Sequence, residues 1–564
     1  MPNKSHITDR SFWGWGWADF ALNESETGLI DGIARVFGRD PASIAPEPTV
    51  SEFDLRAPRI SAPESLADLV SDEARDRLSH SFGKSTADNI RMVMRAVPEP
   101  VDLVAFPKTE GQIAALLDWA GSSDIAVIPY GGGSSVCGGV EPDVGPDYRG
   151  TISLDMQHFD RVLEVDRTSR AARIQAGTYG PALEKQLRPH DLTLRFFPQS
   201  FEFSTLGGWI ATRAGGHYAT VMTHIDDLVE STRMVTPVGI METRRLPGSG
   251  AGISGDRMVL GSEGNLGIIT EAWMRLQERP RFRASASVRF DSTSLAAEAV
   301  RALSQSGLYP TNCRLLDEGE VAAYGIGDGK SATLVLGFES ADHPLGPWIE
   351  RALELAADHG GHWDKAAVAA SLSGGDQHRK GAAGSWRETF IRMPYYRDRL
   401  TRLGVLVDTF ETAITWDRFE DFYRNVMADV GAAIRSATGK PGRLSCRFTH
   451  VYPDGPAPYF TFYCDGGDPS DPSQMLNRWR AIKRAANTAV TAHGGTVTHH
   501  HAVGRDHRSG YEAQTSPLLR AALSGAKAQL DPQSILNPGV LIDPANRTVG
   551  QRGVLANDHS DRKS

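Results

Sequence analysis

Cysteine is scarce in this sequence, with four residues among 564. Cys137, Cys313, Cys446 and Cys464 lie far apart and form no CxxC motif, which argues against a disulfide-dense scaffold and a cysteine-rich zinc site. The pattern fits reduced thiols in a cytosolic enzyme. Cys137 stands in a glycine-rich loop; we expect a small buried filler there, with a reactive thiol as the alternative.

Long apolar runs and excess positive charge are also missing. No run of 18 apolar residues occurs, and the N-terminus lacks the apolar core of a signal peptide, so the sequence predicts a cytoplasmic protein without a transmembrane helix. The formal net charge is −9, and no basic face for a nucleic acid is evident; we expect no nucleic-acid partner. Apolar residues (40%) and charged residues (23%) have ordinary globular proportions.

Three tryptophans, Trp13, Trp15 and Trp17, stand close together near the N-terminus. We expect their rings to dock on the protein's own surface, and insertion at a membrane interface is the alternative.

Five segments are predicted along the chain. Residues 1–96 mix short helices with proline-rich connectors and predict a wrapping arm. Residues 97–280 predict a nucleotide-binding domain, 281–500 a substrate (cap) domain, 501–545 a segment that returns to the nucleotide domain, and 546–564 a disordered tail.

Strands and helices alternate irregularly in residues 97–280, which favours an α+β domain over a doubly wound sheet. Strands 101–106 and 125–128 flank a helix over 110–120, and 233–237 pairs with 240–244 as a hairpin. In the second domain, helices are expected over 294–306, 347–360, 416–430 and 472–494, interleaved with strands over 333–338, 405–410 and 459–464.

Several glycine-rich loops follow one another. Pro129–Ser135 comes directly after a buried strand, and its glycines and hydroxyls suit a pyrophosphate. Further loops occupy Pro198–Gly208, Ala211–Gly216 and Leu260–Ile269. Small residues spread over about 140 positions fit an elongated dinucleotide. The literal GxGxxG at Gly250–Gly255 follows no strand, and we take it as coincidence.

The ordered motifs GGGSS, SFEFSTLGGWIATRAGG and LGSEGNLGIIT resemble the vanillyl-alcohol-oxidase/p-cresol-methylhydroxylase (PCMH-type) superfamily of FAD enzymes. The resemblance implies a two-subdomain PCMH-type FAD-binding domain and an α+β cap domain built on an antiparallel sheet. The FAD contacts that it implies are Pro129, Tyr130, Gly131, Gly132, Gly133, Ser134, Ser135, Pro198, Gln199, Ser200, Phe201, Glu202, Phe203, Ser204, Ala211, Thr212, Arg213, Ala214, Glu263, Gly264, Asn265, Leu266, Gly267, Ile268 and Ile269.

Some members of this superfamily attach FAD covalently through histidine. His158, His217 and His224 lie in the FAD-binding part of the chain, but the subfamily with the nearest resemblance lacks such a link. We therefore expect non-covalent FAD.

A run of histidines, His499-His500-His501, is the stretch of the chain best suited to catalysis. On a strand only His499 and His501 would share a face, and no carboxylate or cysteine lies at ligand spacing, so we predict no metal. Histidine exchanges protons near neutral pH, which favours a catalytic role over a structural one.

HHHAVG at His499–Gly504, together with Thr409–Arg418, Tyr396–Asp398 and Tyr459–Phe462, resembles the alkyldihydroxyacetonephosphate (alkylglycerone-phosphate) synthase family over residues 95–545. The resemblance implies a transferase of ether-lipid synthesis. Flavin N5 attacks C1 of acyl-dihydroxyacetone phosphate, the fatty acid leaves, and a fatty alcohol replaces it without net redox change.

The same resemblance assigns roles to individual residues. His499, His500 and His501 supply a base, Arg397 steadies the phosphate or the leaving carboxylate, Tyr459 positions or protonates the substrate, and Arg314 supports the site. The structural alternatives are a surface pair of Arg397 with Asp398 and a simple core position for Tyr459.

The sequence departs from this family at Ala502, where glycine is usual, and at Leu536–Gly539, which is closer to redox members. It also lacks an evident peroxisomal targeting segment. An FAD-dependent oxidase or dehydrogenase of a 2-hydroxy acid or alcohol is therefore the second hypothesis, and an idle flavin-binding scaffold is the third. Under the first hypothesis the partners are lipid-like small molecules, with peripheral membrane association and a homodimer as options.

Overall fold

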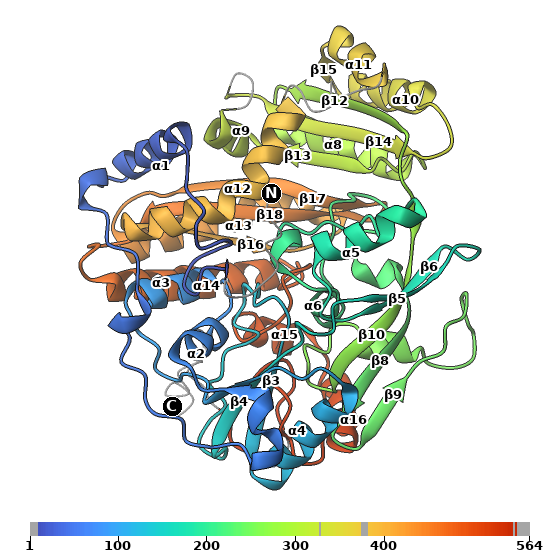
Figure 1. The fold of residues 1–564 in the computed structure, drawn as a ribbon. Helices are drawn as coiled ribbons and strands as arrows, with labels where there is room; N and C mark the ends of the chain where they lie inside the picture. Colours follow the sequence, from blue (N-terminus) through green and yellow to red (C-terminus); the bar gives the residue numbers. More distant parts are fainter. Residues whose placement is uncertain (1–8, 326–328, 374–381, 545–546, 550–564) are drawn as a thin grey trace.

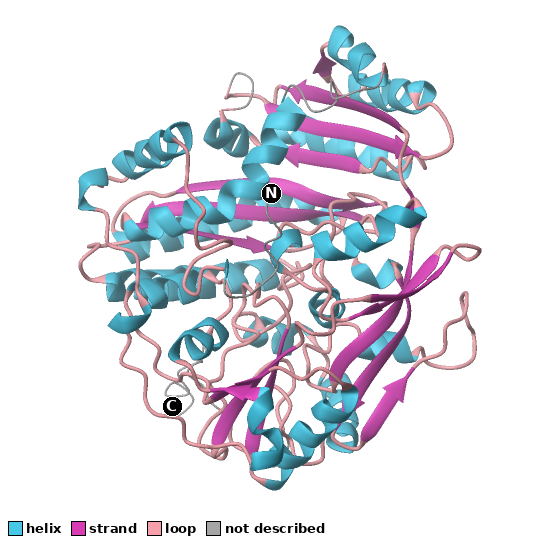
Figure 2. Cartoon of the chain, viewed as in Figure 1, coloured by secondary structure: helices cyan, strands magenta, loops and turns pink. Residues whose placement is uncertain are grey.

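A computed structural model of the chain describes residues 9–325, 329–373, 382–544 and 547–549. Three main β-sheets organise it: two lie in the lower part of the molecule and a larger one lies above them (Figures 1 and 2). No described helix is long and apolar enough to cross a membrane.

The first sheet has four strands in the order β1-β2-β4-β3. The strands are β1 (Val70–Ser71), β2 (Leu103–Ala105), β3 (Ile125–Tyr130) and β4 (Gly150–Asp155). β4 pairs in parallel with both β2 and β3, and α4 (Glu110–Ser122) supplies the crossover helix. Leu536 from the C-terminal segment forms a parallel bridge with Val127, so this segment returns to the first sheet.

The second sheet is antiparallel, in the order β5-β6-β10-β8-β9. Its strands are β5 (Val162–Asp166), β6 (Ala171–Gln175), β8 (Val229–Thr236), β9 (Gly239–Glu242) and β10 (Ile268–Arg275). The predicted hairpin is confirmed, with Thr236 paired to Gly239. The helices α5 (Gly180–Leu187), α6 (Leu206–Thr212) and α7 (Gly255–Val259) also belong to this part, and β7 (Leu192–Thr193) pairs separately with β11 (Gln277–Glu278).

The third sheet has seven antiparallel strands in the order β15-β12-β14-β13-β17-β18-β16. They are β12 (Phe282–Phe290), β13 (Asn312–Leu316), β14 (Ala332–Ser340), β15 (His362–Trp363), β16 (Val405–Glu411), β17 (Arg443–Tyr452) and β18 (Gly455–Asp465). With the two smaller sheets, this antiparallel sheet confirms the α+β fold class that the sequence predicted, and the cap domain is built on an antiparallel sheet as expected.

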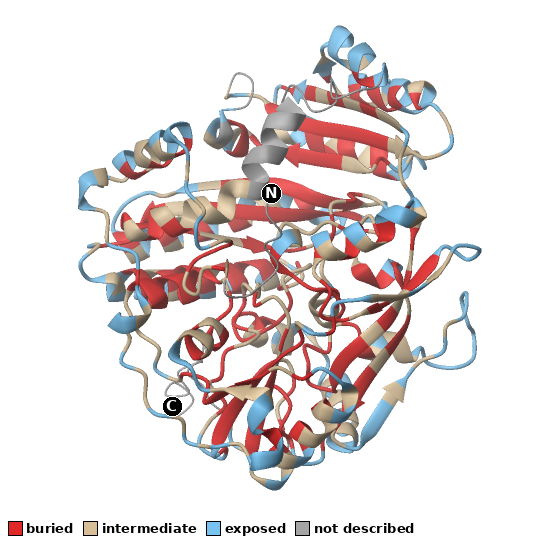
Figure 3. Ribbon diagram, in the orientation of Figure 1, coloured by how far each residue is buried: buried red, intermediate tan, exposed pale blue. Residues whose placement is uncertain are grey.

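Helices pack against this third sheet, called the cap sheet below (Figure 1). They are α8 (Thr293–Gln305), α9 (Glu318–Tyr324), α10 (Gly346–Ala357), α11 (Lys365–Leu372), α12 (Ala382–Arg402), α13 (Trp416–Thr438) and α14 (Pro472–Ala492). Alternate strand residues such as Cys446, Phe448, Phe460 and Phe462 join the helices in one apolar core (Figure 3). The residues between them therefore point to the opposite face of the sheet.

The N-terminal arm runs along both parts of the molecule through α1 (Glu24–Val36), α2 (Ala74–Ser81) and α3 (Thr86–Val93). The ring centroids of Trp15 and Trp17 lie 5.6 and 5.2 Å from that of Phe203. Docking of these two tryptophans on the protein's own surface is thus confirmed.

Several predicted elements need adjustment. α13 continues to Thr438, eight residues beyond the predicted end at Val430, and α12, α15 (Arg508–Gln514) and α16 (Pro517–Leu530) were not predicted. Most of the predicted tail at 546–564 lies outside the described residues. All four cysteines are buried and free, which confirms the filler role expected for Cys137.

Candidate active site

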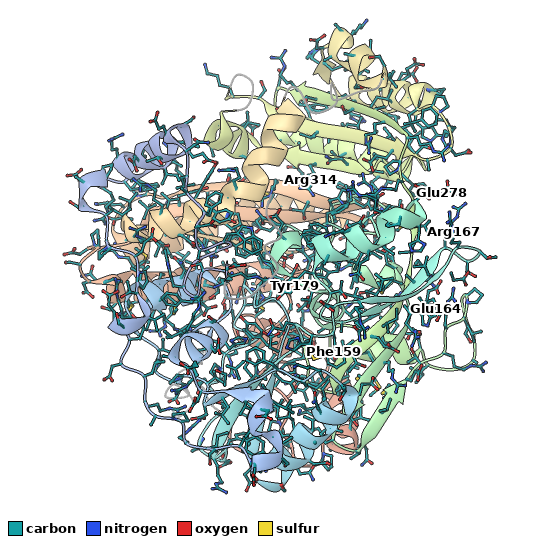
Figure 4. All side chains as sticks on the ribbon, viewed as in Figure 1. Phe159, Glu164, Arg167, Tyr179, Glu278 and Arg314 are labelled. Atoms are coloured by element: carbon teal, nitrogen blue, oxygen red, sulfur yellow. The ribbon has the colours of Figure 1, made fainter. Side chains whose placement is uncertain are left out.

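One large pocket lies between the glycine loops and the cap sheet. Side chains on the face of the cap sheet opposite its apolar core line it. They are Arg314 on β13, Arg447 and Thr449 on β17, Tyr459, Thr461 and Tyr463 on β18, and Val407 and Thr409 on β16. Figure 4 marks Arg314 on this sheet and Tyr179 in the FAD-binding part below it. The pocket therefore joins the two regions that the sequence singled out.

Most of the predicted cofactor contacts line this pocket. They are Pro129, Tyr130, Gly131, Gly132, Gly133, Ser134, Ser135, Pro198, Gln199, Ser200, Ser204, Ala211, Thr212, Ala214, Glu263, Gly264, Gly267, Ile268 and Ile269. The structure thus gathers four stretches that are distant in sequence around a single cavity.

Six predicted contacts do not line the pocket: Phe201, Glu202, Phe203, Arg213, Asn265 and Leu266. Phe203 lies under Trp15 and Trp17, and Leu266 belongs to a hydrophobic core. Arg213 forms an ion pair with Asp226, at 2.7 Å. Phe203, Leu266 and Arg213 thus support the loops from behind, because a motif includes residues that hold its backbone in place.

The loop over Gly131–Ser135 fits the pyrophosphate of FAD. None of its backbone N–H groups donates a hydrogen bond to another described residue. A Cβ atom on Gly132 would lie 2.0 Å from the carbonyl oxygen of Phe203, and Gly133 has a φ of +66°. Glycine is therefore needed for the loop to pass this close to its neighbours, and a cluster of unpaired N–H groups is an anion-binding feature.

Two buried amides add to this fit. The side-chain amide of Asn265 has no hydrogen-bond partner among the described residues, nor has Oδ1 of Asn537. Buried polar groups are normally satisfied, and a polar ligand in the adjoining pocket would satisfy these. Asn537 itself lines the pocket, and the sequence reasoning did not select it.

The histidine run is not a strand, so the condition under which only His499 and His501 would share a face does not apply. Buried Glu411 explains the difference. Its carboxylate accepts hydrogen bonds from the backbone N–H groups of His499 (2.7 Å), His500 (3.2 Å) and His501 (3.0 Å). One side chain thus accepts from the backbone of three successive residues, in place of the ladder partners of a strand.

A second carboxylate holds the other end of this segment. Glu263, in the glycine loop of the FAD-binding part, accepts hydrogen bonds from the N–H groups of Val503 and Gly504, both at 2.8 Å. Burial raises the pKa of Glu263 to about 7, while these two amides lower it. The histidine segment is thus fixed between the cap sheet and the cofactor loops.

The imidazoles form a hydrogen-bonded group. Nδ1 of His499 lies 3.0 Å from Nδ1 of His500, and Nε2 of His499 lies 2.7 Å from the hydroxyl of Tyr452 and 3.1 Å from Nε2 of His224. His500 and His501 line the pocket, and His499 lies behind them. Burial lowers the pKa of His499 and His501 well below the ordinary histidine value, so neutral rings dominate near pH 7.

The grounds on which a metal was excluded need revision. Ring nitrogens of His450, His499 and His500 lie within 4.8 Å of one another, a spacing that could hold an ion. The strand argument missed His450, which comes from β17. However, His450 donates from Nε2 to the carbonyl oxygen of Gly216 (2.9 Å), and its Nδ1 lies 3.1 Å from the hydroxyl of Thr449. Hydrogen bonds thus occupy both of its nitrogens.

Arg397 lines the pocket, and two of its three side-chain nitrogens make no hydrogen bond to the described residues. Its Nη1 donates to the carbonyl oxygen of Lys84 at 2.6 Å, whereas Nη2 lies 3.6 Å from a carboxylate oxygen of Asp398. Nε and Nη2 are buried and make no hydrogen bond to the described residues. Arg397 and Asp398 do form an ion pair, but it is buried and not on the surface, and Asp398 also accepts from the N–H of Trp15 and from Asn89.

Tyr459 also faces the pocket, and not only the core. Its hydroxyl donates to the hydroxyl of Thr409 at 3.0 Å, and the guanidinium of Arg447 lies 3.9 Å from its ring centre. Burial raises the pKa of Tyr459, so the phenol stays protonated. Burial, together with Arg447, lowers the pKa of Arg314 to about 9, and a nearby anion would relieve the cost of this buried charge.

His158, His217 and His224, the three candidates for a covalent link, do not line the pocket. His217 packs beside Phe197 and Tyr218 instead. The GxGxxG at Gly250–Gly255 is also outside the pocket and largely exposed, in line with coincidence.

Sequence reasoning missed Glu411, His450, Tyr452, Arg447 and Asn537. Polar residues at alternate positions of the buried strands, Arg447-Thr449 and Tyr459-Thr461, carried a usable signal, because a fully buried strand face is normally apolar. The pairing of Glu411 with residues 499–501 joins positions about 90 apart in the chain and left no such local signal.

Two family models match the chain. A model described as an FAD binding domain matches residues 101–244, and a model described as the C-terminal domain of FAD linked oxidases matches residues 279–541. Together they cover both walls of the pocket.

The chain is similar to alkyldihydroxyacetonephosphate synthases. It is 32% identical to the enzyme of Dictyostelium discoideum over 85% of this chain and 79% of that protein, and 29% identical to the enzyme of Trypanosoma brucei brucei over 83% and 78%. A solved structure of an alkyldihydroxyacetonephosphate synthase aligns with a TM-score of 0.76 at 25% identity, covering 94% of this chain and 99% of that one.

Proposed function

Because the chain belongs to the alkyldihydroxyacetonephosphate synthase family of FAD enzymes, we propose that it exchanges the acyl group of acyl-dihydroxyacetone phosphate for a fatty alcohol. The balanced reaction consumes the acyl ester and the alcohol, and it yields the alkyl ether, a fatty-acid carboxylate and one proton. When bound, FAD would supply a nucleophilic ring nitrogen with no net redox change.

The observation that carries this proposal is the mixed lining of the pocket. Beyond Arg397 and the cofactor loops, apolar side chains from α1, α12 and β16 line the same cavity: Leu29, Ile33, Met393, Leu400 and Val407. A cation beside an apolar wall suits a substrate that carries both an anionic group and a hydrocarbon chain. A small 2-hydroxy acid would leave this wall unused.

In this proposal Arg397 binds the anion of the substrate. Nε and Nη2 are the two donors that the described residues leave unused, and a guanidinium can bind a phosphate or carboxylate through two parallel hydrogen bonds. The third nitrogen stays on the Lys84 carbonyl, which fixes the plane of the group.

The proposed base is His500, whose ring lines the pocket and whose Nδ1 lies 3.3 Å from Glu411. Uptake of a C1 proton would create an imidazolium, and the carboxylate would stabilise it. Tyr459 is held protonated, and with substrate bound its O–H would turn from the hydroxyl of Thr409 to the oxygen of the leaving acyloxy group. His501 and Arg314 line the same cavity and complete its polar wall.

Anaerobic rapid mixing tests the proposal against the redox hypothesis. We expect ether formation from palmitoyl-dihydroxyacetone phosphate and hexadecanol, with the flavin oxidised at the end of turnover. Rapid bleaching by a 2-hydroxy acid, with no ether formed, would support an oxidoreductase instead.

We further propose that the protein visits membrane surfaces to collect its substrates, because both carry long hydrocarbon chains. Co-sedimentation with phosphatidylcholine vesicles, with and without hexadecanol, tests this association. Gel filtration with in-line light scattering would measure the mass in solution and show whether a homodimer forms.

A further inference from the structure

A row of three histidines leads from the pocket to the Arg213 backbone. His500 lines the pocket, His499 lies behind it, and His224 follows, directly before the short 3-10 helix η7 (Ile225–Asp227). The linking nitrogens are 3.0 Å apart between His500 and His499 and 3.1 Å apart between His499 and His224. His224 ends the row with Nδ1 at 2.9 Å from the carbonyl oxygen of Arg213.

That carbonyl determines where each proton sits. A carbonyl oxygen only accepts, so Nδ1 of His224 carries a proton and Nε2 of the neutral ring is an acceptor. Nε2 of His499 must then donate to His224, which leaves Nδ1 of His499 as an acceptor. Nδ1 of His500 must in turn donate to His499, and Nε2 of His500 is left with its lone pair.

The contacts of Tyr452 agree with this assignment. Its hydroxyl lies 2.7 Å from Nε2 of His499 and 3.1 Å from the hydroxyl of Thr223. Because His224 already requires the proton on Nε2 of His499, the phenol oxygen accepts there, and its own proton is directed to Thr223.

Two rings of the row, His224 and His499, are neutral in this arrangement. Burial is the largest cause that lowers the pKa of His224 and His499, and the neighbouring histidines lower both further. The charged and titratable groups around the row, apart from its own members, are Glu411, His450, His501, Tyr452, Tyr459, Arg213 and Asp226. Glu411 alone among these is a carboxylate beside His500, on the side of Nδ1.

Nε2 of His500 has no hydrogen-bond partner among the described residues. We propose that His224 and Tyr452 are positioning residues that hold His499 as its Nε2–H tautomer and thereby present the unprotonated Nε2 of His500 to the substrate. The inference rests on the proposed function for the role of His500 as base. The tautomers follow from the contact geometry and from neutral His224 and His499, and not from the proposed reaction.

The tautomer proposed for His500 is the less favoured one of a free histidine side chain, which prefers its proton on Nε2. The row and the Glu411 carboxylate, 3.3 Å from Nδ1 of His500, together favour it. If the row is broken, His499 can donate from its own Nδ1 to His500, and part of the His500 population should shift to the Nε2–H form, which presents no lone pair to C1 of the substrate.

The direct test is ¹⁵N NMR of protein labelled at the histidine ring nitrogens, since protonated and unprotonated ring nitrogens have well-separated shifts. His500→Gln identifies the His500 signals by their loss. We expect a protonated Nδ1 and an unprotonated Nε2 on His500 in the wild-type protein at pH 7.5. The opposite assignment would overturn the proposal, whatever the activity of the protein.

Variants provide the second test. His224→Phe combined with Tyr452→Phe removes both acceptors, and we expect kcat to fall roughly 10- to 100-fold, the usual range for partners that orient a reacting imidazole. KM and FAD content should stay within about twofold. The loss should be the same from pH 6 to 9, because the ratio of two neutral tautomers does not depend on pH.

Tyr148→Phe is the matched control. Its hydroxyl also makes a buried hydrogen bond, to the Ser534 carbonyl at 2.6 Å, but it does not line the pocket. Normal kcat in the control and reduced kcat with a shifted His500 tautomer in the double variant would support the proposal. An unchanged His500 tautomer in a folded double variant would refute it. Lack of synthase activity in the wild type would count against the proposed function alone, since the NMR result stands apart from turnover.

Discussion

The carboxylate of Glu411 lies 2.7 Å from the backbone nitrogen of His499. Glu411 ends a strand of the cap sheet, and His499 starts the segment that carries the catalytic candidates. Glu263, from the cofactor loops, accepts hydrogen bonds from Val503 and Gly504 at the other end of that segment. Two buried carboxylates therefore fix the histidines relative to both walls of the pocket. Each prediction below follows from this arrangement.

Glu411→Gln should lower both stability and activity. An amide cannot accept on both sides, so at least one of the three backbone donors loses its acceptor, at a cost of roughly 2–3 kcal/mol of unfolding free energy. Thermal unfolding would measure the loss, and Glu47→Gln, at an exposed ion pair, is the control. Equal melting temperatures for Glu411→Gln and the wild type would contradict this role.

The pH dependence of that loss is also defined. Burial raises the pKa of Glu411, but His500 and His501 outweigh it and hold this pKa well below the ordinary value. A carboxylate whose pKa is depressed in the folded state stabilises the protein at pH values above its unfolded pKa of about 4.3. This stabilisation is lost as the pH falls through the folded-state pKa. The difference in unfolding free energy between wild type and Glu411→Gln should therefore be constant from pH 6 to 8 and shrink in strong acid. A difference that grows with acidity would show that the sign is wrong.

Arg397→Ala should reduce kcat/KM about 100-fold or more, because a charged hydrogen-bonding partner of the substrate anion is removed. Arg397→Lys should recover little of this loss, since an ammonium cannot form two parallel hydrogen bonds. Steady-state kinetics on protein with normal FAD absorbance makes the comparison. Near-normal turnover in Arg397→Ala would remove this arginine from the site.

Tyr459→Phe should lower kcat more than it raises KM, because the phenol acts on the leaving oxygen and contributes little to ground-state binding. Tyr309→Phe, an exposed tyrosine, is the control. Equal kcat for wild type and Tyr459→Phe would reduce Tyr459 to a packing residue.

Chelation should not affect the enzyme. Hydrogen bonds occupy both ring nitrogens of His450, so we expect no stoichiometric metal by mass spectrometry and no loss of activity after dialysis against EDTA. An equimolar metal whose removal abolishes turnover would assign the histidine cluster to an ion.

FAD should be released on acid precipitation, with the yellow colour in the supernatant, since His158, His217 and His224 lie outside the pocket lining. Colour that stays with the precipitate would show a covalent bond.

Local patterns made much of this structure predictable. Pro129–Ser135 could be read as a cofactor loop because its glycines and the strand before it are contiguous in sequence. Tyr459 and Arg397 came from motif resemblance, and the structure places both in the pocket. The geometry of the histidine run could not be read in this way. A strand was the only form considered for this run, and its local sequence does not show Glu411, 88 residues away, which accepts from its backbone. His224 meets His499 across 275 residues, so no sequence spacing could show the pair.

The most direct measurement is the fate of ¹⁸O from labelled hexadecanol incubated with palmitoyl-dihydroxyacetone phosphate and the FAD-loaded protein. The account predicts that mass spectrometry finds the label in the ether oxygen of hexadecyl-dihydroxyacetone phosphate. It also predicts that the reaction releases one unlabelled palmitate for each ether formed. Label recovered in hexadecyl palmitate would indicate acyl transfer, and label recovered only in unreacted alcohol would mean that the protein does not catalyse the exchange; either result would contradict the account.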